Sequence, residues 1–100
     1  MENITEIDAG NPTIRLLGNL TSFNLAENFI PKIQHLETMR SLVTLNLSSN
    51  KISKIENLNF PNLQELDLSY NQIDSIGNLK PLKKLQTLNL SHNAVENPSL

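Results

Sequence analysis

The chain has 100 residues, a formal net charge of −2 and no cysteine. Its length predicts a single domain with one modest core, and the lack of cysteine excludes disulfide bonds and cysteine-based metal sites. No run approaches the roughly 18 apolar residues that a membrane span needs, so we expect no membrane contact and a cytoplasmic protein, with cytoskeletal, ciliary and nuclear placements open.

A short pattern, L-x-x-L/F-x-L-x-x-N-x-I/V, recurs along the chain. The first unit is atypical, because Pro12 stands where the later units have asparagine and proline has no N–H to offer. Terminal repeats are often atypical, although an extended N-terminal arm is the alternative for this segment. In chain order the predicted units are residues 4–19, 20–41, 42–62, 63–84 and 85–100, the last of them incomplete.

Each unit opens with leucines at its first, fourth and sixth places, which alternate with polar residues. This period of two is typical of a short, half-buried strand. One such strand cannot bury its apolar face alone, but copies lying side by side share a core. The pattern predicts parallel strands near residues 22–25, 44–47, 65–68 and 87–90 in one curved sheet.

Apolar residues continue after each strand at a spacing of three, as in Ile52, Ile55 and Leu58. Side chains three apart line up in a 3₁₀-helix, so this spacing predicts tight 3₁₀-like turns that return the chain along the convex side.

An asparagine occupies the ninth place of each of the last four units. At the bend that leaves a strand, its side chain can bond backbone N–H and C=O groups that would otherwise be buried unpaired. We therefore predict a structural ladder made of Asn28, Asn50, Asn71 and Asn93.

The segments KISKIENL (51–58) and QIDSIGNL (72–79) resemble the class of intracellular leucine-rich repeats that are about 22 residues long. Members include the nuclear regulatory subunit of protein phosphatase one and the axonemal dynein light chain. The resemblance implies an α/β solenoid: a right-handed superhelix with a curved parallel sheet on the concave side and 3₁₀ or irregular turns on the convex side. It does not identify a partner, because function does not follow from fold.

The strand side chains that point away from the core define a candidate binding surface. Every charge on it is a carboxylate, whereas all lysines and arginines fall on the return segments, so we expect a protein partner, of basic character, on the concave face. A solvated polar face without a partner is the alternative. Tyr70 suits an interface anchor. The predicted partner-binding residues are Glu6, Asp8, Asn24, Glu27, Asn46, Glu65, Asp67, Tyr70, Asn89 and His92.

No catalytic, cofactor or metal site is expected. Glu65 and Asp67 would lie on an open sheet without a cleft, and His92 has no second imidazole near it. No phosphate-binding loop or nucleophile motif occurs. The cluster Lys80, Lys83 and Lys84 could touch phosphate or an acidic surface, but such clusters are usually solvated, and we expect no nucleic-acid partner.

The sequence favours a protein-interaction scaffold in a cytoskeletal or ciliary assembly. Two alternatives stay open: a regulatory subunit that recruits a phosphatase or sits in a ribonucleoprotein, and the repeat segment of a larger enzyme or signalling protein. Because the last unit has Asn97 and Pro98 in place of the usual isoleucine turn, we expect more chain or another subunit to cover the C-terminal end of the array.

Overall fold

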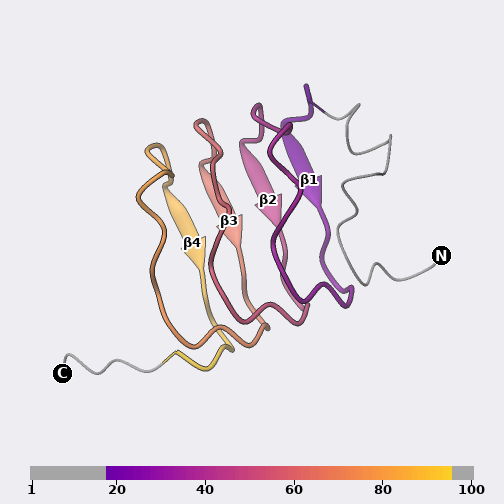
Figure 1. Cartoon of the computed structure of the whole chain (residues 1–100), viewed down its shortest axis with the longest axis vertical. Coiled ribbons are helices and arrows are strands. Elements are labelled where there is room, and N and C mark those ends of the chain that lie inside the picture. The colour runs from indigo at the N-terminus through magenta and orange to yellow at the C-terminus, as the bar shows by residue number, and fades with distance from the viewer. Residues whose placement is uncertain (1–17, 96–100) are drawn as a thin grey trace.

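The computed structural model describes residues 18–95, so most of the expected first unit, including Glu6 and Asp8, lies outside the described residues. Four strands form one parallel sheet in the order β1-β2-β3-β4, and all of the predicted strands are confirmed (Figure 1). The strands are β1 (Ser22–Asn24), β2 (Thr44–Asn46), β3 (Glu65–Asp67) and β4 (Thr87–Asn89).

The register of the sheet places equivalent positions of successive units side by side. Phe23 pairs with Leu45, Leu45 with Leu66, and Leu66 with Leu88. Each pair combines the fourth places of two units, so every place in the sequence pattern becomes a row of side chains that crosses the sheet.

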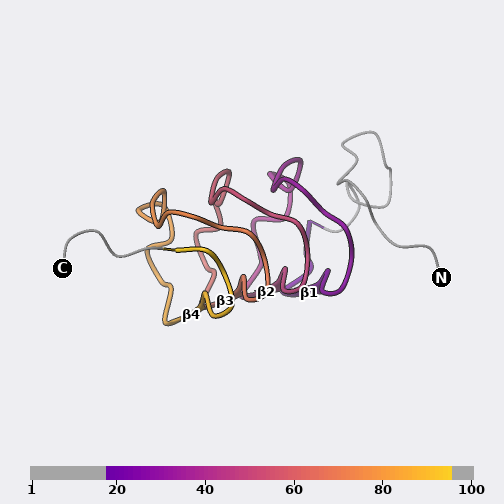
Figure 2. The same cartoon turned by 90° about the horizontal axis from the view of Figure 1, so that it is seen from below.

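The core lies between the sheet and the return segments, which run along the opposite side of the molecule (Figure 2). Leucines at the sixth place, Leu47 and Leu68, are fully buried, as are Ile52 and Ile73 on the return segments. Each unit therefore buries its apolar side chains against the unit beside it, which is how a solenoid forms a core from short pieces.

One prediction about the return segments is not confirmed. No helix of any kind occurs among residues 18–95, so the 3₁₀-like turns expected at the isoleucine places are not found there. Single turns with i to i+3 hydrogen bonds occur later, for example from Leu63 N to Phe60 O at 3.2 Å. The isoleucine segments bond between units instead, as in Lys51 N to Ile30 O at 2.9 Å and Gln72 N to Ile52 O at 2.8 Å. Backbone groups used between units are not available for a helix within one unit.

The ninth-place asparagines bond backbone groups of two units at once. Asn71 donates through Nδ2 to Leu47 O at 3.0 Å in the preceding unit and to Leu68 O at 3.1 Å in its own. Its Oδ1 accepts from Ile52 N at 3.0 Å. Asn50 and Asn93 repeat this arrangement, and Asn28 Nδ2 donates to Leu25 O at 2.9 Å.

A second amide column runs along the return segments, and the sequence analysis missed it. Asn57 Nδ2 donates to Ile33 O and Asn78 Nδ2 donates to Ile55 O, both at 2.8 Å. Both asparagines have φ of 58°, a left-handed conformation that asparagine tolerates better than most residues. The repeated Ile-x-Asn-Leu (in Ile55–Leu58 and Ile76–Leu79) was the available signal.

Candidate partner-binding face

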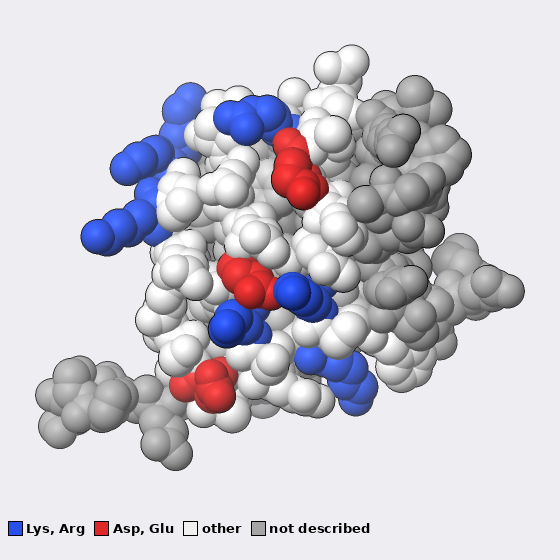
Figure 3. All heavy atoms as spheres, viewed as in Figure 1, with Lys and Arg blue, Asp and Glu red and all other residues white. Residues whose placement is uncertain are grey.

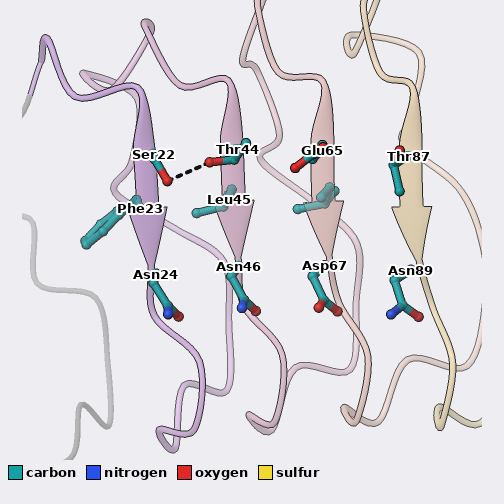
Figure 4. Close-up of a pocket in the computed structure, with 11 residues that line it drawn as sticks. Ser22, Phe23, Asn24, Thr44, Leu45, Asn46, Glu65, Asp67, Thr87 and Asn89 are labelled. Carbon is teal, nitrogen blue, oxygen red and sulfur yellow. Dashed lines mark hydrogen bonds between the residues drawn. The ribbon is translucent and has the colours of Figure 1, made fainter.

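The sheet presents one uncovered surface, the open face, which is a wide, shallow hollow (Figure 4). Two polar rows cross it, because side chains on either side of the buried fourth place point away from the core. The third-place row is Ser22, Thr44, Glu65 and Thr87, and the fifth-place row is Asn24, Asn46, Asp67 and Asn89.

The fifth-place row also has a local structural role. Asn46 Oδ1 accepts a hydrogen bond from Ser48 N at 2.9 Å, and Asp67 Oδ1 accepts from both Ser69 N at 2.9 Å and Ser69 Oγ at 2.6 Å. Asn24 and Asn89 accept in the same way from the N–H two residues on. Each side chain thus holds the turn that leaves its strand, as Asx turns do. The other polar atom of each side chain, the amide nitrogen of asparagine or the second oxygen of aspartate, is available to bind a ligand.

The third-place row is less constrained. Thr44 Oγ1 donates to Ser22 Oγ at 2.7 Å, which ties the first two positions together, whereas Glu65 is exposed. Glu65 and Asp67 leave β3 on the same face, so the negative charge of the open face is concentrated at that strand.

Tyr70 and His92 form a stacked pair at the carboxyl ends of β3 and β4. Their ring centroids are 4.1 Å apart and the ring planes are 11° from parallel. Tyr70 is 55% exposed. Both residues have positive φ, 56° and 57°, as do Glu27 and Ser49 at the same place of the earlier units. Holding a tyrosine in a left-handed conformation is costly.

Phe29 is a second exposed aromatic residue near this edge, with 48% of its surface accessible. A shallow groove lined by Glu27, Ser49 and Lys51 lies between Phe29 and Tyr70. Sequence reasoning did not single out Phe29, because it follows the ladder asparagine at a place that holds Lys51, Gln72 and Ala94 in the other units and so shows no pattern.

The side of the return segments carries charges of both signs. Several lysine and arginine side chains lie there among acidic ones, and a basic group projects beside the loop that precedes β4 (Figure 3). Lys80, Lys83 and Lys84 belong to that loop, and all three are exposed. The loop consists of turns.

The described part of the chain contains no group of three histidine, aspartate or glutamate side chains placed to hold a metal ion. Within residues 18–95, no helix is long and apolar enough to cross a membrane. The open face thus offers amide, hydroxyl and carboxylate groups on a hollow surface, a set suited to hydrogen bonding with another macromolecule.

Comparison with known proteins agrees with this geometry. A family described as leucine rich repeat matches residues 40–95, and a two-copy leucine-rich repeat family matches residues 18–60. Together the two matches cover all four strands. No curated protein matches the chain significantly.

Proposed function

Because the chain belongs to the leucine-rich repeat family, whose repeats generally mediate protein–protein interaction, we propose that it is a binding module whose protein partner docks on the open face. The partner contacts Glu65 and Asp67 with basic groups and covers the Tyr70–His92 stack. Binding rather than catalysis is the proposed role, since a shallow open sheet does not exclude water from its carboxylates.

One observation supports this proposal above the others. Tyr70 lies at the edge of the hollow and is 55% exposed. Its ring stacks on His92, and its backbone has a conformation that disfavours tyrosine. Aromatic anchors of this kind contribute much of the energy of protein interfaces, because they bury a large area at a small cost in side-chain entropy.

The test is affinity capture from a cell lysate with the immobilised chain, followed by mass spectrometry. Tyr70→Ala should reduce the retained partner by about tenfold or more, as loss of an interface anchor does. Lys80→Ala, a change on the opposite side of the molecule, is the matched control and should retain the partner. If Lys80→Ala lost the partner and Tyr70→Ala retained it, the interface would lie on the side of the return segments instead.

The proposal extends to the setting of the module. We propose a scaffold in a cytoskeletal or ciliary assembly, because the repeat class that the sequence resembles includes the axonemal dynein light chain. Captured tubulin or dynein components would support this setting. Captured phosphatase or ribonucleoprotein components would favour a regulatory subunit instead, since the same class includes the phosphatase regulatory subunit.

A further inference from the structure

The eighth places of the units form a row beyond the carboxyl ends of the strands. The row consists of Glu27, Ser49, Tyr70 and His92. Backbone hydrogen bonds between units align it, as in Ser49 N to Ser69 O at 2.9 Å. Serine is the smallest of the four side chains and is half-buried, whereas Glu27 and Tyr70 on either side of it are exposed. The row therefore has a notch at Ser49.

The ring of Tyr70 forms one wall of this notch. It stacks on His92, in the following unit, with the planes 11° apart and the centroids separated by 4.1 Å. Because the covered face of the ring points to the following unit, its other face points to the preceding unit, where Ser49 lies in the same row. Tyr70 and Ser49 line one groove. The notch thus has an open aromatic face on one side.

Glu27 forms the opposite wall, and its carboxylate is not neutralised within residues 18–95. Neither Glu27 nor Lys51, which also lines the groove, forms an ion pair in that part of the chain. The Ser49 hydroxyl between the walls has no hydrogen-bond partner among the same residues. Because neighbouring strands lie about 4.8 Å apart, the two walls leave roughly 9.6 Å between their backbones. This is room for one flat side-chain group.

We propose that the notch binds an arginine side chain of the partner. The guanidinium stacks on the free face of Tyr70 and donates hydrogen bonds to the Glu27 carboxylate and the Ser49 hydroxyl. The negative face of an aromatic ring attracts a cation and repels a carboxylate, so an acidic side chain, which Lys51 alone would attract, is disfavoured. Arginine fits better than lysine, because its planar group can stack and bond a carboxylate at the same time. The inference rests on the proposed function and names the group that docks beside Tyr70.

A peptide titration followed by NMR tests the inference without the partner. The probe is acetyl-glycine-arginine-glycine-amide, compared with the same peptide carrying lysine or citrulline, which is neutral but of nearly the same shape as arginine. We expect the arginine peptide to shift the amide resonances of Ser49 and Tyr70 in a saturable manner. It should bind about twofold more tightly than the lysine peptide and about fivefold more tightly than the citrulline peptide. Absence of a saturable shift at these two amides, or equal binding of the arginine peptide and either counterpart, would overturn the inference.

Substitutions assign the binding to the two walls. Tyr70→Ala and Glu27→Gln should each lower the affinity for the arginine peptide by about two- to fivefold, which corresponds to an exposed cation–π contact or ion pair. Glu37→Gln, the same change of charge at an exposed residue of a return segment, is the control and should bind as the parent does. Lys51→Gln should raise the affinity, because it removes a like charge from the groove. Equal losses from Glu37→Gln and Glu27→Gln would reduce the effect to a general attraction between charges and contradict a site at the notch.

This result is separable from that of partner capture. A Tyr70→Ala variant that retains the partner contradicts the proposed function. A chain that captures its partner through Tyr70 but does not distinguish arginine from citrulline contradicts only the arginine notch. The dispersion of the same NMR spectra shows that each variant is folded.

Discussion

Each ladder asparagine forms hydrogen bonds with several backbone groups at a buried bend. Asn50 and Asn71 are 5% and 9% accessible, and each bonds carbonyl groups of two units and the N–H of an isoleucine. Truncation leaves these groups buried without partners. Asn50→Ala and Asn71→Ala should therefore each lower the free energy of unfolding by about 1–3 kcal/mol, as measured by urea denaturation.

Asn59 provides the control for this experiment, since it is exposed and outside the ladder. Asn59→Ala should leave the denaturation midpoint close to that of the parent. If Asn50→Ala and Asn71→Ala unfold at the parent's midpoint as well, the ladder bonds do not hold the bends.

The left-handed asparagines of the return segments allow a finer comparison. Asn78→Gly removes the bond to Ile55 O but keeps a residue that tolerates φ of 58°. Asn78→Ala removes the bond and adds the cost of a Cβ in that conformation, about 1–2 kcal/mol. Thermal unfolding should rank the parent above the glycine variant and the glycine variant above the alanine variant. The reverse order of the two variants would show that the conformation, once formed, is not strained.

The strands hold equivalent places in the repeat pattern but differ in environment. Leu66 is 1% accessible between β2 and β4, whereas Leu88 is only partly buried. Leu66→Ala should cost about 2–5 kcal/mol of unfolding free energy, in the range of buried leucines, and Leu88→Ala should cost less because less apolar area is lost. Urea denaturation measures both losses. Similar losses would mean that Leu88 is covered as well as Leu66.

The strands were predictable because burial on one face imposes a period of two that the leucines record. The backbone conformation of the return segments was not predictable, since a spacing of three arises whenever every third side chain faces the core. Ile52 and Ile55 meet that condition without a helix. Only the hydrogen bonds distinguish the two cases.

The candidate site was partly predictable for a related reason. Tyr70 and His92 occupy the same place in adjacent units, so stacking the units brings them together. The turn-holding bonds of Asn46 and Asp67 depend on the backbone two residues later, which a column of polar residues does not reveal.

At the scale of the whole molecule, stability should decline from β3 toward β4. In a solenoid each unit is stabilised by its neighbours, and β4 has a described neighbour on one side only. Hydrogen exchange should therefore show weaker protection for the amide of Leu68, bonded to β4, than for that of Leu47, bonded to β3. Equal protection of the two amides would indicate that residues 18–95 open as one unit.

The matched register of the strands also restricts the shape of a ligand that can follow the polar rows. Successive strands of a sheet lie about 4.8 Å apart, whereas an extended peptide advances about 3.4 Å per residue and soon falls out of phase with the rows. An α-helix advances about 5.4 Å per turn, close to the strand spacing. A helix laid across β1 to β4 would present about one turn to each strand, so that Asn24, Asn46, Asp67 and Asn89 would meet side chains three or four residues apart.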